Sequence, residues 1–205
     1  MTLPSPRTLL MAASAFVAAG LLAVGGWFWH SSGQHRAMSA YAAALTQAQS
    51  AQGPQAAPDA REAAIRGLES ALTQYSSGSG AAEVAYQLGN LRFEGQQYSQ
   101  ARGAWELAVA QGATRTLKAL SLGGVAYTWE AERDYPKAVE AFKTALTGIG
   151  PKDFYYEELL LGLGRTQELA GQKAEAIATY RRALSELTQS RRAEEIRARL
   201  AALGA

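Results

Sequence analysis

The chain has 205 residues, a formal net charge of +2 and no cysteine, and 48% of its residues are hydrophobic. This length allows one domain with a membrane anchor, and the balanced charge excludes a bulk attraction to nucleic acid. Without cysteine the chain has no disulfide, no thiolate nucleophile and no cysteine-based zinc site. Its two histidines, His30 and His35, lie together near the N-terminus. The rest of the chain therefore lacks the commonest general base and metal ligand, and we expect no cofactor, no metal and no catalytic residue.

Residues 1–7 form a short N-terminal segment, and residues 8–29 contain no charged side chain. A run of 22 uncharged residues can cross the hydrocarbon core of a bilayer, which takes about 20 residues. The run ends in "WFW", and tryptophan favours the interface between lipid and water. The sequence therefore predicts a single transmembrane helix. The alternative is a cleavable signal peptide, whose apolar core is usually shorter and followed by small residues.

The span has few flanking charges to orient it. Arg7 precedes it, and Arg36 is the first arginine after it. Because so few residues precede the span, we expect the N-terminus inside the cytoplasm and the remainder in the periplasm of a bacterium, with the span in the inner membrane. Ala15, Ala19 and Ala23 share one face of the span, on which a second membrane helix could pack closely. The alternative is that alanine is simply common in this chain.

Residues 30–75 read as a degenerate first repeat. A helix is expected over residues 34–49, and the connection 50–59, rich in Gly, Pro, Ala and Gln, is predicted to be mobile. The second helix of this unit carries Ala64, Leu68 and Ala71 at i, i+4 and i+7, which places them on one face.

Residues 80–187 repeat that pattern three more times, with successive copies 37 or 38 residues apart. In each copy an alanine is followed by an aromatic residue and a second alanine, and a small residue stands 12 positions before the first alanine. The sets are Ala101, Trp105 and Ala108 after Gly89; Ala138, Phe142 and Ala145 after Ala126; and Ala176, Tyr180 and Ala183 after Gly164. Each copy predicts two helices joined by a short turn, and Gly95 and Gly171 suit helix ends.

This pattern resembles the tetratricopeptide repeat, whose signature places Leu-Gly in the first helix and Ala, an aromatic residue and Ala in the second. The resemblance implies an all-α fold in which the transmembrane helix is followed by a right-handed α-solenoid of about four helical hairpins. Residues 188–205 are predicted to form a capping helix that begins at an N-cap, Ser190, and covers the last apolar face with Ala193, Ile196 and Leu200.

The concave face of such an array is lined by the first helix of each hairpin and can hold a segment of another protein. The repeat register gives six candidate peptide-groove residues: Tyr86, Asn90, Phe93, Tyr127, Glu130 and Arg165. The alternative is that the aromatic members pack within the core or between repeats. Asn90 matches a position that related arrays use in a carboxylate clamp, but the accompanying lysines are missing.

The whole layout is similar to the YfgM-like family, ancillary subunits of the bacterial SecYEG translocon with one membrane helix and a periplasmic tetratricopeptide-like domain. The resemblance rests on the span, its exit through "WFWH" and the Ala- and Tyr-rich helix that follows. It implies a membrane-anchored interaction scaffold that meets secreted chains, chaperones or translocon subunits and assists secretion or envelope assembly.

The alternative is a structural accessory subunit of a larger inner-membrane complex. We expect no nucleic-acid partner and no small-molecule substrate. An enzyme is not expected, because no histidine lies within residues 80–187.

Overall fold

The computed structural model describes residues 33–53, 55–76 and 78–205, and in these residues the chain is helical without strands. Residues 33–50 form a leading helix. The helices that follow are α2 (Pro58–Gln74), α3 (Ala81–Glu94), α4 (Tyr98–Ala110), α5 (Arg115–Ala131), α6 (Tyr135–Ala145), α7 (Tyr156–Leu169), α8 (Lys173–Glu186) and α9 (Ala193–Ala202). The predicted all-α fold is confirmed for this part of the chain.

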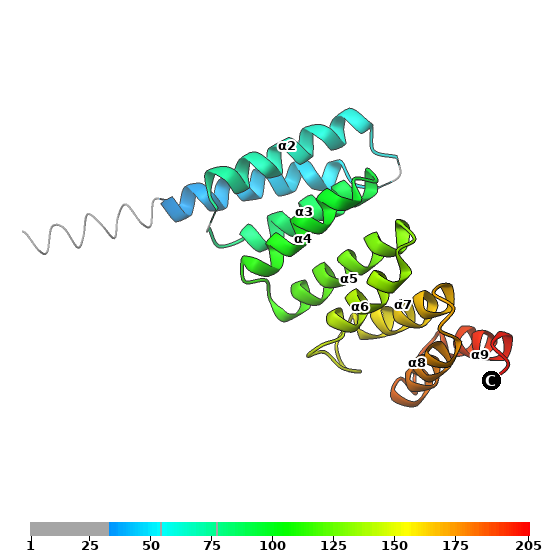
Figure 1. The fold of residues 1–205 in the computed structure, drawn as a ribbon. Helices are drawn as coiled ribbons and strands as arrows, with labels where there is room; N and C mark the ends of the chain where they lie inside the picture. Colours follow the sequence, from blue (N-terminus) through cyan, green and yellow to red (C-terminus); the bar gives the residue numbers. More distant parts are fainter. Residues whose placement is uncertain (1–32, 54, 77) are drawn as a thin grey trace, which may run out of the picture.

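Consecutive helices pair into hairpins, and the hairpins stack in chain order (Figure 1). Helices α3 and α4, α5 and α6, and α7 and α8 form the three predicted pairs, while α4 packs on α5 and α6 on α7. The leading helix packs with α2 through Ala37, Tyr41, Ala44 and Ala48. Each element therefore contacts mainly its neighbours in sequence, as in a solenoid.

The C-terminal helix α9 packs on α8 and buries Ile196 and Leu200. Its predicted start is wrong: the helix begins at Ala193, and Ser190 lies in the preceding turn. The Ser190 hydroxyl accepts a hydrogen bond from the Arg192 amide at 3.0 Å and donates one to Glu157. Its side chain is used by this turn and by α7, so it does not cap α9.

The small and aromatic residues of the repeat form the core. Ala101, Ala138 and Ala176 are fully buried, and Trp105 is nearly so. Trp105 lies between two glycines on different helices. A Cβ built on Gly89 of α3 would lie 2.5 Å from Trp105 Cδ1, and one built on Gly124 of α5 would lie 2.7 Å from Trp105 Cδ2. The indole therefore occupies the space of two missing side chains, one in its own hairpin and one in the next.

The same arrangement recurs along the array. A Cβ on Gly162 of α7 would lie 2.6 Å from Phe142 of α6, and one on Gly164 would lie 2.7 Å from Tyr180 of α8. Gly124 and Gly162 each contact the aromatic ring of the preceding hairpin. Each stands two residues before the small residue of the repeat pattern, Ala126 or Gly164. In α3 that position is Gln87, and the preceding helix α2 presents Leu68 instead of an aromatic ring.

The turn inside each hairpin contains one residue in the left-handed backbone conformation. These residues are Gln96, Arg133 and Gly171, with φ of 60°, 62° and 74°. Gly95 and Gly171 both lie at helix ends, as predicted. Only Gly171 takes the left-handed conformation itself; Gly95 has φ of −79°, and the next residue, Gln96, takes that conformation. Two of the three turns therefore place a residue with a Cβ in a conformation that favours glycine.

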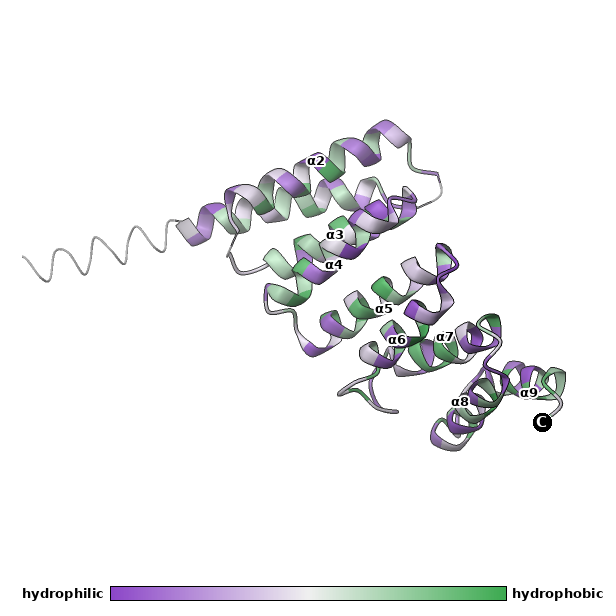
Figure 2. Cartoon of the chain, viewed as in Figure 1, coloured by the Kyte–Doolittle hydropathy of each residue, from purple (hydrophilic) through white to green (hydrophobic). Residues whose placement is uncertain are grey.

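The predicted transmembrane span, residues 8–29, and its candidate packing face, Ala15, Ala19 and Ala23, lie outside the described residues. Within residues 33–205, as far as they are described, no helix is both long enough and apolar enough to cross a membrane. Figure 2 shows hydrophobic and hydrophilic residues mixed along these helices, which is typical of helices that bury one face against a neighbour.

We predict that Gly124→Ala destabilises the protein by about 1–3 kcal/mol, because its methyl group would overlap the Trp105 ring. The matched control is Gly103→Ala in α4, where a Cβ meets nothing within 4 Å; there alanine should stabilise the helix by about 0.5–1 kcal/mol. Urea unfolding followed by circular dichroism measures both values. Equal effects of the two substitutions would contradict the packing described for Trp105.

We also predict that Arg133→Gly stabilises the protein by about 1 kcal/mol, because it relieves the cost of a left-handed backbone at a residue with a Cβ. Glu132→Gly, one residue earlier at φ of −79°, should destabilise it instead. Thermal unfolding of the two variants beside the parent chain tests the opposite signs.

Candidate functional site

The six predicted groove residues come from the first helices of three hairpins. Tyr86, Asn90 and Phe93 lie on α3, Tyr127 and Glu130 on α5, and Arg165 on α7. All six are partly buried. Their contacts decide how much of each side chain is available to a partner.

On α3, two of the candidates hold their own hairpin together. The Asn90 side-chain oxygen accepts a hydrogen bond from Trp105 Nε1 at 3.3 Å, and its amide nitrogen donates to Gln87 at 3.2 Å. The Phe93 ring packs on Tyr98 and Trp105, with ring centroids 5.5 and 5.8 Å apart. Tyr86 packs against the first core cluster. For Phe93 and Tyr86 these are the contacts of the packing alternative, and Asn90 also uses its side chain within its own hairpin.

Between α5 and α7, the candidates form a polar bridge across adjacent repeats. Arg165 donates two hydrogen bonds to the Glu130 carboxylate, at 2.9 and 3.2 Å, and the Thr166 hydroxyl donates a third. The Tyr127 hydroxyl donates to Glu158 at 2.8 Å. Glu130 and Arg165 keep only 18% and 34% of their side-chain surface exposed, so they link the two helices from a half-buried position.

Burial, the neighbouring Tyr155 and the Glu158 carboxylate raise the pKa of Tyr127 well above its usual value. Tyr127 therefore remains a protonated hydrogen-bond donor at physiological pH. Its ring meets Phe142 edge-on, with centroids 5.0 Å apart. This tyrosine is suited to fixing Glu158 in place and unsuited to acting as a base.

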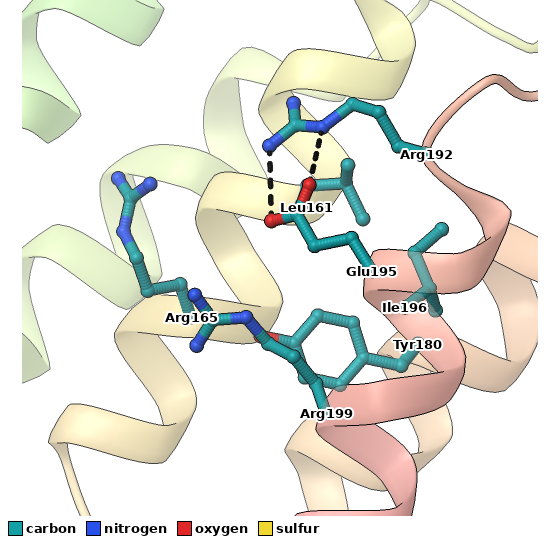
Figure 3. A pocket seen from close by; sticks show the side chains of 7 residues that line it. All are labelled: Leu161, Arg165, Tyr180, Arg192, Glu195, Ile196 and Arg199. Carbon is teal, nitrogen blue, oxygen red and sulfur yellow. Dashed lines mark hydrogen bonds and ion pairs between the residues drawn. The ribbon is translucent and has the colours of Figure 1, made fainter.

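The polar bridge continues from α7 to α9 through residues outside the six groove candidates. Arg192 donates to Glu158 at 2.8 Å and to Glu195 at 3.0 Å, and Arg199 donates to Glu168 at 3.3 Å. In Figure 3 the Arg199 side chain lies beside the Tyr180 ring, while Arg192 pairs with Glu195 at the start of α9. The hydrogen bond with Arg192 lowers the pKa of Glu195.

From the sequence alone, Glu158, Glu195 and the C-terminal arginines are expected to form solvated charged faces. Glu195 is indeed exposed and pairs with Arg192 three residues before it. Glu158, Arg192 and Arg199 are only partly exposed, and their ion pairs also connect α7 with α9 and the turn before it. The available signal was the separation of the partners: Glu130 and Arg165, and Glu158 and Arg192, stand about one repeat apart in sequence.

Beside this bridge lies a surface hollow of about 490 Å³, lined by Phe154, Tyr155, Glu157, Glu158 and Arg192. Burial, together with Glu158, raises the pKa of Tyr155 to about 12, so its hydroxyl is neutral in solution. The hollow therefore combines an aromatic wall with carboxylates. Among the described residues there is no group of three His, Asp or Glu side chains that could hold a metal ion.

No protein-family model and no curated protein matches the chain. Among solved structures, the TPR-like repeats of a putative kinesin light chain from Podosopora anserina align with a TM-score of 0.53 and 15% sequence identity. The alignment covers 82% of this chain and 95% of that chain. A point variant of those repeats gives a TM-score of 0.54 at 15% identity, over 82% and 94% of the two chains. At this identity the similarity shows the fold alone: the chain is a tetratricopeptide-like repeat array.

We predict a coupling energy of about 1 kcal/mol between Glu130 and Arg165, because the pair is half-buried and doubly hydrogen-bonded. The measurement is a double-mutant cycle with Glu130→Gln and Arg165→Met, read from urea unfolding. The control cycle uses the exposed pair Glu140 and Lys143 within α6, where we expect about 0.3 kcal/mol. If the Glu130–Arg165 coupling energy is no larger than that of the control pair, these hydrogen bonds do not stabilise the contact between α5 and α7.

Proposed function

We propose that this protein is a membrane-anchored scaffold for protein–protein interactions, with its repeat array in the periplasm of a bacterium and its span in the inner membrane. In this proposal it works beside the translocon, where it meets secreted chains or chaperones during secretion or envelope assembly.

The observation that carries the proposal is the repeat array itself. Stacked helical hairpins present one continuous face made by their first helices, and such faces hold segments of other proteins. Here that face offers exposed Glu83 on α3, partly exposed Tyr86, and the hollow at the start of α7. The repeat fold therefore favours partners that are polypeptides.

The chemistry of the face agrees with binding. Its ionised groups are largely paired with one another, as in Glu130 with Arg165 and Glu158 with Arg192. The raised pKa values of Tyr127 and Tyr155 keep their hydroxyls protonated. A general acid–base catalyst needs a pKa near the working pH, which these tyrosines do not have. Fold alone does not determine function, so the proposal needs an experiment that identifies the polypeptides in contact with the array.

The anchor and the periplasmic placement rest on the sequence. The uncharged run at residues 8–29 supports the anchor, and the resemblance to the YfgM-like family supports the periplasmic placement. The resemblance also supports the proposal that the protein acts beside the translocon.

The test is photo-crosslinking in living cells with a photoreactive residue at one position at a time. The probe at Glu83 reports on the first-helix face, and the probe at Ala19 reports on the predicted span. Both positions avoid the polar bridge, which a probe at Tyr127 would disturb. The control is Glu140, an exposed residue on α6, a second helix. We expect Glu83 to trap exported chains or chaperones, Ala19 to trap translocon subunits, and Glu140 to trap far less.

Two outcomes would contradict the proposal. If Glu83 and Glu140 trap one identical fixed set of subunits, the protein is a structural subunit of a larger complex. If the Glu83 probe traps no polypeptide, the first-helix face is not a binding face.

A further inference from the structure

The connection between α6 and α7 presents one aromatic ring to solvent. Phe154 is 89% exposed, although the two residues that follow it, Tyr155 and Tyr156, are partly and fully buried. The exposed ring stands on a fixed support. Arg115 donates to the carbonyl of Gly148 at 2.7 Å and to Asp153 at 3.2 Å, and Asp153 accepts from the Gly150 amide at 2.8 Å.

Phe154 forms one wall of the 490 Å³ hollow, and Tyr155 forms another. This volume is in the range of protein sites for small groups, about 300–1,000 Å³. The other lining residues are Glu157, Glu158 and Arg192. An aromatic wall beside carboxylates is the lining that a cation with an apolar stem requires, because aromatic faces and carboxylates both attract positive charge.

The charges of the hollow do not balance. Arg192 is shared between Glu158 and Glu195, so its charge is satisfied by two carboxylates. Glu157 accepts a hydrogen bond from the neutral Ser190 hydroxyl, and no ion pair within the described part of the chain involves it. Lys152 and Arg191 are near in sequence but do not line the hollow. Glu157 therefore leaves one negative charge at the aromatic wall.

We infer that this hollow receives an arginine side chain from a partner polypeptide. In this arrangement the guanidinium stacks on Phe154 and donates to the Glu157 carboxylate, and its aliphatic stem lies against Tyr155. The inference rests on the proposed function, since it names the chemistry of the segment that the array binds.

Arginine suits the site better than lysine for two reasons. Its planar guanidinium stacks on aromatic rings, and its donor fork matches a carboxylate with two parallel hydrogen bonds. A lysine ammonium is a compact and strongly hydrated charge, so it gains less from an open aromatic wall. The Arg115 and Asp153 contacts order the backbone of the connection that carries Phe154. Less of this connection therefore has to be ordered when the partner binds.

The experiment uses the full chain, purified with its N-terminal segment, with 4-fluorophenylalanine replacing Phe154 and, in a separate sample, replacing Tyr86. The probe is the peptide acetyl-Ala-Leu-Arg-Ala-Ala-amide, beside versions with lysine or citrulline in place of arginine. Citrulline keeps the shape of arginine without its charge. Fluorine NMR follows each titration.

We expect the arginine peptide to shift the fluorine signal at position 154 in a saturable way, with the lysine peptide weaker and the citrulline peptide without effect. Glu157→Gln should weaken the arginine peptide about tenfold, because a charge-assisted hydrogen bond is lost. Glu140→Gln, a matched change on α6, should leave the titration unchanged.

The inference is overturned if the citrulline peptide binds as well as the arginine peptide, if Glu157→Gln has no effect, or if the signal at position 154 does not move. A shift at position 86 alone would place binding on the first-helix face outside the hollow. That result would still be compatible with the proposed scaffold function. The scaffold function itself is tested separately, by whether the Glu83 probe crosslinks to a polypeptide.

Discussion

The array depends on one steric constraint: an aromatic ring on the second helix of a hairpin needs a glycine or alanine on each first helix that it packs against. Trp105 shows this most fully, because it fills the space beside Gly89 in its own hairpin and beside Gly124 in the next. The ring thereby sets both the distance within a hairpin and the distance between hairpins. Phe142 at Gly162 sets the next junction in the same way. The hairpins share these rings, so their spacing is a property of the stack.

The polar bridge from α5 to α9 depends on that spacing. Glu130 and Arg165 stand on the first helices of adjacent repeats, and their side chains meet only when the intervening ring holds α5 and α7 at the observed distance. Arg192 extends the bridge to the start of α9. The face therefore has fixed positions for its charges, and fixed charges favour a selective face over a generally adhesive one.

Much of the fold could be predicted from the sequence because the repeat imposes residue size at fixed spacing. Ala101, Ala138 and Ala176, each with an aromatic residue four positions later, are enough to predict the hairpins and their buried faces, and all three alanines are buried. Details that depend on a partner far along the chain could not be predicted from local patterns. Ser190 reads locally as an N-cap, and its bond to Glu157 becomes visible only in three dimensions.

The same distinction applies to the site. The repeat register placed Tyr127, Glu130 and Arg165 on the first helices, but periodicity cannot say whether such a residue faces a partner or a neighbouring repeat. No periodic sequence pattern marks Phe154, because it lies in the connection between α6 and α7, where helical periodicity does not apply. Phe154 directly follows Asp153, whose side chain pairs with Arg115 from far earlier in the chain.

One junction lacks the ring that the others share. Between α2 and α3 the contact is made by Leu68, and the ion pairs of Arg92 with Glu69 and Arg61 with Glu94 join the two helices. In a linear array, cooperativity passes from unit to unit through such junctions, and a chain of unequal links opens first at its weakest one. The leading helix and α2 nevertheless share one apolar core cluster with α3 and α4. Apolar packing therefore holds this junction as well, and only the part that the two ion pairs contribute weakens as salt is added.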